Sequence, residues 1–356
     1  MRGLFGLRPR VLALIDLMQD IDVILPVILA LRADGRFALS VRVSRWLSAE
    51  SPRTAALLRR HALPFRLVRR TEVTAGAAPS LRGVAAVICA SESSHPAHAA
   101  GHALAGRAST LGIRSYALQH GFENVGLFGV EAGAARFASD VVFCWFPEAA
   151  RPADLPADTA ARLAHVGRPL LAAEAGAPPA PAFDLGVFEN LHWDRYDERD
   201  RQAFRQGLFA VASAMPRRRI LLHPHPAGRW ADGLSHELAP FGNITRVSAD
   251  EARARPGGGA ALLQGVRRVI TTPSTVALDA AQLGRPTALA AAGGDPYRPL
   301  PVLSGPQDWV AFASAAESDG AALDQFLSRV LVAGDAAPRI LERLGRDLLG
   351  ESGTDD

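Results

Sequence analysis

One segment near the carboxyl end constrains the fold of this chain more than any other. Residues 268–291 (RVITTPSTVALDAAQLGRPTALAA) place a β-type run before a hydroxyl-rich turn, an apolar helix, a Gly-Arg-Pro break and a second β-type run. This order predicts a βαβ unit. The start of its helix leaves backbone N–H donors unpaired and carries the positive end of the macrodipole, which favours an anion. Thr272, Ser274 and Thr275 add hydroxyls there, and a plain helix cap is the alternative.

Short apolar runs alternate with helical patterns along the rest of the chain as well. Such alternation predicts right-handed crossovers and a mainly parallel sheet. In the first half we expect strands at Val11–Ile15, Ala38–Val43, Phe65–Val68, Val84–Cys89, Ser115–Leu118, Val141–Trp145 and 164–169, and helices near Ile21–Ala33, Pro52–His61 and Pro96–Leu111. In the second half we expect strands at Leu185–Phe188, Ile220–Leu222 and Ile244–Val247, and helices at Glu198–Met215, Asp232–Ala239 and within 309–349.

One composition shift divides this alternation into two parts. Residues 172–182 (AAEAGAPPAPA) are small, rich in proline and without periodicity, which is typical of an interdomain linker; a surface loop within one domain is the alternative. We therefore predict an α/β protein of two Rossmann-like, doubly wound parallel-sheet domains that face each other across a cleft. The first domain covers 1–171, the second covers 183–335, and a C-terminal helix and tail cover 336–356.

Composition argues against several classes of protein. The 356 residues include no lysine, so all 39 basic residues are arginines, and with 36 acidic residues the net charge is +3. Nucleic-acid binding favours a basic stripe or interleaved aromatic side chains, and neither is evident, so no nucleic-acid partner is expected. No run of about 20 uncharged apolar residues is present, so we expect no transmembrane helix. A peripheral contact with the inner face of the membrane, for example through Arg217–Arg219, stays open.

The cysteines indicate the compartment. Cys89 and Cys144 both lie in apolar, strand-like runs, which favours buried, reduced thiols and a cytoplasmic protein. No Cys/His spacing resembles a zinc site, so we expect no metal ion.

Histidines follow two of the expected strands. His120 lies in the segment Gln119-His120-Gly121 of the first half, and His223 and His225 form an HPHP sequence in the second half. The prolines of HPHP fix φ and remove backbone donors, so both imidazoles would leave the sheet on a stiff segment. Imidazole donates to phosphate oxygens, and its charge responds to a nearby anion near neutral pH. A hydrogen-bonded structural role is the alternative for each histidine.

Taken together, these motifs resemble a group of GT-B enzymes. An HP sequence after a strand, followed about 50 residues later by a strand, a Ser/Thr pair and an apolar helix, is similar to the HP and Ser-Ser motifs of bacterial capsule glycosyltransferases. These include bacterial polysialyltransferases, capsular Kdo transferases and CDP-glycerol glycerophosphotransferases. The Gln119-His120-Gly121 segment is similar to the QHG segment of the Kdo transferases. The segment at residues 187–191 (VFENL) resembles the loop at the start of the second domain in several relatives.

The resemblance implies a metal-independent glycosyltransferase of capsule or lipopolysaccharide-type surface polysaccharide synthesis. A Kdo- or sialic-acid-like sugar, or a polyol phosphate, would pass from a CMP- or CDP-activated donor to a glycan or lipid-linked acceptor, with no further cofactor. The first domain would bind the acceptor and the second the donor nucleotide. The residues expected at the nucleotide and its phosphates are His223, His225, Thr272, Ser274, Thr275, Glu189 and Asn190, and those on the acceptor side are Gln119 and Gly121.

The catalytic base is less closely indicated. An inverting transfer needs a carboxylate or an imidazole within hydrogen-bond reach of the acceptor hydroxyl. We expect His120 first, then Glu92 and Glu123, with Asp16 as a further candidate. A retaining transfer would instead use Glu92 or Glu123 as nucleophile. The chain departs from the family pattern in having Thr275 in place of a second serine, and in lacking the acidic doublet before glycine that supplies the polysialyltransferase base.

Two other functions fit the same motifs. An enzyme similar to UDP-GlcNAc 2-epimerases would keep the fold, the strand-end histidines and the hydroxyl-rich turn, but would need no acceptor. A catalytically inactive, nucleotide-binding GT-B protein would keep the donor site and lack the base. Turnover of UDP-GlcNAc without an acceptor would identify an epimerase-like enzyme. Binding of a nucleotide without turnover of any donor and acceptor would identify an inactive protein.

Overall fold

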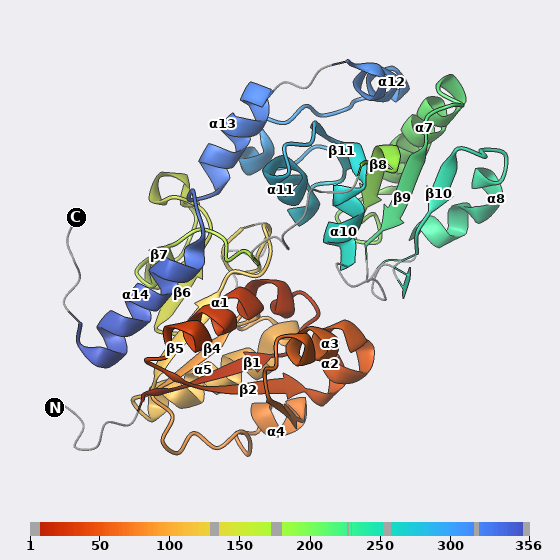
Figure 1. Ribbon diagram of the computed structural model, residues 1–356. Helices are drawn as coiled ribbons and strands as arrows, with labels where there is room; N and C mark the ends of the chain where they lie inside the picture. Colours follow the sequence, from red (N-terminus) through yellow and green to blue (C-terminus); the bar gives the residue numbers. More distant parts are fainter. Residues whose placement is uncertain are drawn as a thin grey trace. The chain divides into compact units, whose positions relative to one another are not determined.

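The computed structural model describes residues 8–128, 135–171, 180–225, 228, 230–248, 250–251, 258–316 and 320–351. The chain divides into two compact units, one of Met1–Glu174 with Val330–Asp356 and one of Ala175–Arg329 (Figure 1). Most of the expected linker, residues 172–179, and Pro226 of the HPHP sequence lie outside the described residues.

The first unit is built on a seven-stranded parallel sheet with the order β3-β2-β1-β4-β5-β6-β7. Its buried strands are apolar on both faces, as expected when helices cover a parallel sheet on both sides. The strands are β1 (Arg10–Ile15), β2 (Ala38–Ser44), β3 (Phe65–Val68), β4 (Ala86–Cys89), β5 (Arg114–Leu118), β6 (Val141–Cys144) and β7 (Leu163–His165). The order reverses between β1 and β4, and this switch point is where doubly wound sheets place functional groups.

The helices of the first unit include three that the sequence patterns did not predict, α2, α4 and α6. The helical segments are α1 (Asp20–Asp34), α2 (Arg45–Glu50), α3 (Pro52–Arg60), α4 (Arg70–Thr74), η1 (Pro96–His98), α5 (Ala99–Thr110), η2 (Glu148–Ala150), α6 (Ala157–Ala160) and α14 (Ala336–Leu349). The last of these returns to the first unit, because Ile340 and Leu344 are fully buried and Asp347 accepts a hydrogen bond from the Tyr116 hydroxyl at 3.0 Å.

The second unit is built on a five-stranded parallel sheet with the order β10-β9-β8-β11-β12. Its strands are β8 (Phe183–Glu189), β9 (Ile220–Pro224), β10 (Ile244–Arg246), β11 (Val266–Thr271) and β12 (Thr287–Leu289). Its helical segments are α7 (Glu198–Ala214), η3 (Trp230–Leu234), α8 (Ser235–Leu238), α10 (Gly258–Gln264), α11 (Thr275–Gln282), η4 (Asp295–Tyr297), α12 (Pro306–Ser314) and α13 (Gly320–Val330). Here the switch point lies between β8 and β11.

Close packing of α7 against α12 forms part of the core of the second unit. A Cβ atom at Gly207 would lie 2.4 Å from the indole of Trp309, so only glycine allows this approach. Trp309 and Phe204 are almost completely buried there, with their rings edge to face at 5.3 Å.

The prediction of two doubly wound parallel sheets is confirmed. Within the described residues, no helix is both long enough and apolar enough to cross a bilayer.

Candidate functional site

The switch point of the second unit brings together the ends of β8 and β11. Thr271 lies beside Phe188 in the parallel register, so the residues that follow each strand meet at the same edge. The N–H of Thr272 donates to the Phe188 carbonyl at 3.1 Å, and the N–H of Asn190 donates to Thr272 Oγ1 at 3.0 Å. The turn after β11 and the loop after β8 therefore form one hydrogen-bonded unit.

Ser274 caps helix α11, as its position in the βαβ segment predicts. Its backbone is extended, and its Oγ accepts the N–H of Val276 at 3.3 Å. The Oγ1 of Thr271 lies 3.3 Å from the Ser274 hydroxyl, and Thr275 begins the helix. Ser274 therefore acts as the helix cap, as one of the two interpretations predicts. The positive end of the α11 dipole also lies beside the loop after β8.

Asn190 presents a buried acceptor that has no donor. Its Nδ2 donates to the Pro273 carbonyl at 3.0 Å, which fixes the orientation of the amide. Its side-chain oxygen, Oδ1, is buried and has no hydrogen-bond partner in the described part of the chain. Leaving a buried acceptor unsatisfied costs about 1–3 kcal/mol, so the site favours a ligand that donates a hydrogen bond.

Glu189 lies in the same loop with its carboxyl group buried. Burial raises its pKa to about 7, against the opposing effect of the N–H groups of Leu191 and Ala231, and Asp232 raises it further. The Leu191 N–H donates to Glu189 Oε2 at 2.7 Å. Near neutral pH this side chain therefore changes between hydrogen-bond donor and acceptor.

The HPHP histidines differ in their surroundings. His223, at the end of β9, is buried, and its Nδ1 lies 3.0 Å from the Val247 carbonyl, so Nδ1 carries a proton. The backbone N–H of His225 donates to the Glu189 carbonyl at 2.7 Å. The pKa of His225 is lowered to about 4, first by burial and then by its histidine neighbours His192 and His223.

His192 belongs to this group, although the sequence patterns did not single it out. Its ring stacks on His225 with centroids 4.9 Å apart, and a Cβ atom at Gly228 would lie 2.6 Å from its Nδ1. Both ring nitrogens are buried and without a hydrogen-bond partner among the described residues. The adjacent sequence Asn190-Leu191-His192 follows a strand, and that position was the available signal.

In the first unit, the buried carboxylate of Glu92 has a full set of internal partners. Its Oε1 accepts from His102 Nδ1 at 2.7 Å and from the Ala138 N–H at 2.9 Å. Its Oε2 accepts from the Ser139 N–H at 3.2 Å. These bonds join the loop after β4 to the segment before β6, so they give Glu92 a structural role in this structure.

We expect Glu92→Gln to destabilise the protein by about 3 kcal/mol, because one amide end would face backbone N–H donors. Thermal unfolding followed by circular dichroism measures this effect. The exposed Glu148 supplies the matched control, Glu148→Gln, which should leave the unfolding midpoint unchanged. A stable Glu92→Gln variant would contradict the structural role.

His120 lies just after β5 in a cluster of imidazoles. Its Nδ1 is 3.4 Å from the Ala90 carbonyl, and its backbone N–H donates to Asn124 Oδ1 at 3.0 Å. Burial lowers the pKa of His120 to about 4. The ring of His98 meets it edge-on at 5.0 Å, and the ring of His95 lies 5.4 Å from that of His98.

His98 is the buried centre of this cluster and was not singled out from the sequence. Its Nδ1 lies 2.7 Å from the Ser93 hydroxyl, and its pKa is lowered to about 3 by burial and then by His120 and His95. Both His120 and His98 are therefore neutral near pH 7. The recurrence of histidine at 95 and 98 after a strand was the signal that could have found it.

In the QHG segment, the side chain of Gln119 makes hydrogen bonds to backbone groups. Gln119 is buried, its Oε1 accepts the Trp145 N–H at 2.7 Å, and its Nε2 donates to the Gly121 carbonyl at 2.9 Å. Glu123 is half-buried in the loop that follows. Gln119 therefore fixes the turn that carries His120.

Asp16 and Asp20 occupy the switch point of the first unit. Asp16 Oδ1 accepts from Arg70 Nε at 2.8 Å. Asp20 Oδ2 accepts the N–H of Asp16 at 2.9 Å and of Leu17 at 2.8 Å, and its other oxygen accepts from the Ser91 hydroxyl. Burial raises the pKa of Asp20 to about 7, and the negative charge of Asp16 raises it slightly further.

We expect this pKa to make stability fall as pH rises. The carboxyl group of Asp20 is neutral in the folded chain up to about pH 7, whereas its ordinary value is 3.8. The raised pKa therefore stabilises the folded chain by at most about 4 kcal/mol. This stabilisation is fully present below pH 3.8 and is lost as pH rises through about 7. Asp20→Asn should flatten the dependence, because its amide oxygen accepts both N–H groups. Urea unfolding of both proteins between pH 4 and 8 measures the difference, and parallel curves would contradict this prediction.

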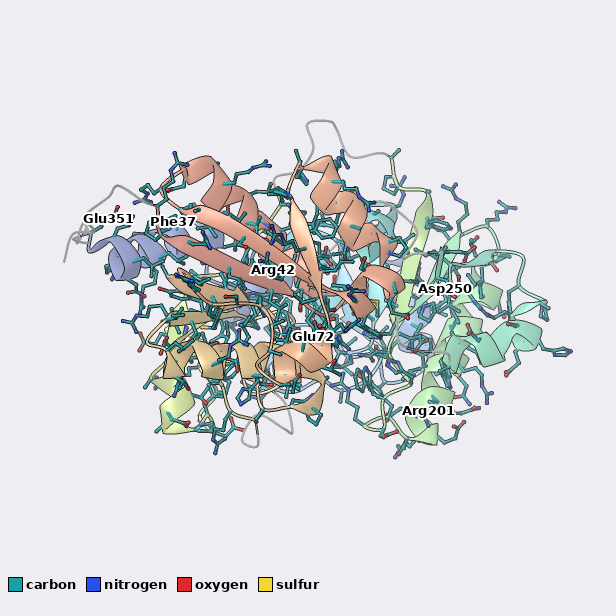
Figure 2. All side chains as sticks on the ribbon, turned by 90° about the horizontal axis from the view of Figure 1, so that it is seen from below. Phe37, Arg42, Glu72, Arg201, Asp250 and Glu351 are labelled. Atoms are coloured by element: carbon teal, nitrogen blue, oxygen red, sulfur yellow. The ribbon has the colours of Figure 1, made fainter. Side chains whose placement is uncertain are left out.

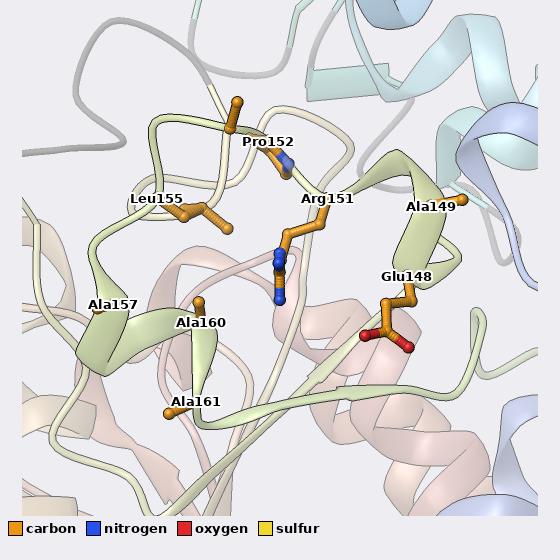
Figure 3. A pocket seen from close by; sticks show the side chains of 9 residues that line it. Glu148, Ala149, Arg151, Pro152, Leu155, Ala157, Ala160 and Ala161 are labelled. Atoms are coloured by element: carbon orange, nitrogen blue, oxygen red, sulfur yellow. The ribbon is translucent and has the colours of Figure 1, made fainter.

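A surface hollow of about 680 Å³ lies in the first unit and is lined by η2, the loop that follows it and α6. Alanines line most of it, with Glu148 and Arg151 as the charged side chains at its wall (Figure 3). None of the residues predicted for the site lines this hollow. In the described part of the chain, no group of three or more His, Cys, Asp or Glu side chains is arranged to hold a metal ion.

Comparison with known proteins shows where this fold occurs. No protein-family model and no curated protein matches the chain. A putative UDP-N-acetylglucosamine 2-epimerase from Listeria monocytogenes is similar with a TM-score of 0.70 at 12% identity, over 98% of this chain and 99% of the other. The UDP-GlcNAc 2-epimerase from Neisseria meningitidis, bound to UDP-GlcNAc, is similar with a TM-score of 0.66 at 12% identity, over 96% of this chain and 100% of the other.

The glycosyltransferase of kitacinnamycin gives a TM-score of 0.61 at 15% identity, over 96% of this chain and 100% of the other. At such identities the likeness concerns the fold. The fold is that of GT-B proteins, and both glycosyltransferases and 2-epimerases of nucleotide sugars adopt it.

Proposed function

We propose that this chain is a nucleotide-sugar-dependent GT-B glycosyltransferase, and that the second unit binds the donor. The observation that carries the proposal is the unsatisfied Oδ1 of Asn190, buried beside the positive end of helix α11. A nucleotide supplies both missing parts, because its phosphates are anions and its ribose hydroxyls or base amino group are donors.

On the donor side, Ser274 and Thr275 with the start of α11 bind the phosphates. His223, whose Nδ1 lies 3.0 Å from the Val247 carbonyl, contacts a phosphate oxygen through Nε2 in this proposal. When the bond between the transferred group and the nucleotide phosphate breaks, the leaving phosphate gains negative charge, and these groups stabilise it.

On the acceptor side, His120 is the proposed base. Its Nδ1 proton is directed to the Ala90 carbonyl, so Nε2 carries the lone pair. As the acceptor oxygen forms its bond to the transferred sugar or phosphoryl group, its proton passes to Nε2, and the electron pair of the breaking bond leaves with the nucleotide phosphate.

The finer assignment follows the resemblance of the motifs. We propose a CMP- or CDP-linked donor, a Kdo- or sialic-acid-like sugar or a polyol phosphate as the transferred group, and a surface-polysaccharide glycan or lipid-linked acceptor. The joint presence of QHG, HPHP and the Thr-Pro-Ser-Thr turn supports it. The proposed reaction requires no metal ion or other cofactor.

A second candidate is a UDP-GlcNAc 2-epimerase-like reaction. The TM-scores of 0.70 and 0.66 with two such enzymes favour it specifically. Epimerisation needs no acceptor, so incubation with UDP-GlcNAc alone, followed by NMR of the sugar protons, separates it from transfer.

Calorimetric titration with CMP, CDP and UDP tests the donor site. We expect millimolar or tighter binding of a cytidine nucleotide, and weaker binding of UDP. Tighter binding of UDP together with turnover of UDP-GlcNAc alone would favour the epimerase. Binding without turnover of any donor and acceptor would indicate an inactive nucleotide-binding protein, and absence of binding by all three would contradict the donor site.

A further inference from the structure

The loop between β8 and α7 carries an arginine that the sequence patterns did not single out. Arg195 lies in this loop, and its Nη2 donates to the Pro273 carbonyl at 2.8 Å. Pro273 directly precedes Ser274, the N-cap residue of α11. The guanidinium group is therefore held at the start of α11, although it comes from a segment 78 residues away in the sequence.

Asn190 reaches the same carbonyl oxygen. Its Nδ2 donates to the Pro273 carbonyl at 3.0 Å, so this oxygen accepts from both side chains and both of its lone pairs are used. Asn190 is only 5% exposed, and its Oδ1 has no donor among the residues that the structure describes. A guanidinium group and an amide with an unsatisfied oxygen therefore meet at one turn, which indicates a site for a ligand.

The loop that carries Arg195 is held by hydrogen bonds on both sides of it. Arg201 lies on α7 (Figure 2), and its Nε donates to the Leu191 carbonyl at 3.1 Å. Asp197 caps α7, because its side chain accepts the N–H of Asp200 at 2.9 Å. Arg195 lies between Leu191 and Asp197 in the chain, so its place at the turn is set by the fold of the second unit.

Positive charge reaches this turn from two sources. The start of α11 carries roughly half of an elementary charge, and the guanidinium of Arg195 keeps a full charge throughout the physiological range of pH. The charge of Arg195 also lowers the pKa of His192, after the larger effect of burial. Glu189 in the same loop offsets this charge only in part, since burial raises its pKa to about 7. The turn therefore favours anions more strongly than a helix start alone does.

Two cationic positions suit a donor that contains two phosphates. A donor linked through a monophosphate brings one phosphate, which the start of α11 and Ser274 can bind. A donor linked through a diphosphate brings a second phosphate, joined to the first through a single oxygen atom. The guanidinium of Arg195 presents its N–H groups in a planar fork that matches two oxygens of such a phosphate.

We propose that Arg195 binds the second phosphate of the donor, and that the donor is linked through a nucleoside diphosphate rather than a monophosphate. This inference rests on the proposed function, and it selects CDP- or UDP-linked donors over CMP-linked ones. The start of α11 with Ser274 binds one phosphate and Arg195 binds the other, while Asn190 Oδ1 accepts from a hydroxyl group of a sugar joined to them. When the bond to the transferred group breaks, the diphosphate gains negative charge, and Arg195 stabilises it.

Calorimetric titration with two matched pairs, CMP with CDP and UMP with UDP, tests the proposal. For the base that the site accepts, the parent chain should bind the diphosphate about ten-fold or more tightly than the monophosphate. Arg195→Gln removes the charge and should weaken binding of the diphosphate roughly thirty-fold, with little change for the monophosphate. Arg195→Lys keeps the charge without the planar fork and should recover part of this loss. The matched control Arg199→Gln removes an exposed guanidinium from α7 and should bind all four nucleotides as the parent does.

Two results would overturn this inference and leave the proposed donor site intact. One is binding of a monophosphate by the parent chain as tightly as of its diphosphate. The other is an equal loss for both nucleotides in Arg195→Gln, which would mean that Arg195 only positions the turn. Absence of binding of all four nucleotides by the parent would instead contradict the proposed function itself. If Arg195→Gln unfolds, Arg195→Lys should still bind the diphosphate more weakly than the parent does, and an unchanged affinity would overturn the inference.

Discussion

His223→Asn should weaken binding of the donor nucleotide roughly thirty-fold, equivalent to about 2 kcal/mol, and lower the rate of transfer at least as much. The asparagine Nδ2 can take the place of the imidazole Nδ1 and keep the hydrogen bond to the Val247 carbonyl, which His223 makes at 3.0 Å. The asparagine side chain is too short to reach a phosphate at the position proposed for contact with Nε2. The variant therefore separates loss of the phosphate contact from loss of the fold. Calorimetric titration with CMP and CDP measures the first, and thermal unfolding measures the second.

Two further variants complete this experiment. His223→Gln places an amide near the position of Nε2 and should recover part of the binding. The exposed His236, in the same unit, supplies the control His236→Asn, which should bind nucleotide as the parent does. If His223→Asn binds CMP and CDP as tightly as the parent does, His223 has only a structural role, and the proposed donor site is wrong.

His120→Asn should lower kcat by about a thousand-fold while the dissociation constant for the nucleotide stays unchanged. General-base catalysis contributes roughly a hundred- to ten-thousand-fold, and asparagine can keep the contact to the Ala90 carbonyl without offering a base. Initial rates with saturating donor give kcat, and titration with the nucleotide gives the dissociation constant. A parallel loss of both would mean that His120 positions the donor instead.

The pH profile gives an independent check on His120. Burial lowers its pKa to about 4, so its imidazole is neutral and able to accept a proton above that pH. We expect kcat/KM to fall on the acid side only as pH approaches 4, provided that the chain stays folded. A midpoint near 6 to 7 would point instead to a group with the raised pKa of Glu189, or to an unperturbed histidine.

The fold was largely predictable because it rests on local patterns. Strand β3 was expected at Phe65–Val68 and is found there, and α7 and α11 begin where capping residues and apolar periodicity indicated. The short helices α2 and α4 were missed because five or six residues carry too little periodicity to be recognised. In the folded chain α2 contacts β2 and β3, and α4 packs against α5.

The candidate site was predictable only in part. Histidines and hydroxyls after strands could be located from the sequence, since the carboxyl ends of parallel strands meet at one edge. Whether a given side chain is free to react depends on its partners. Glu92 illustrates this, because its donors His102, Ala138 and Ser139 lie 10 to 47 residues away in the sequence.

The sequence by itself determined the two doubly wound sheets and the positions after strands where polar groups gather. It did so because hydrophobic periodicity and helix caps act over a few neighbouring residues. Only the tertiary structure decided the chemical state of those groups: the unsatisfied Asn190 oxygen, the neutral His120 and His98, and the near-neutral pKa of Asp20 and Glu189. Burial and hydrogen-bond partners set these states, and both arise from contacts between distant parts of the chain.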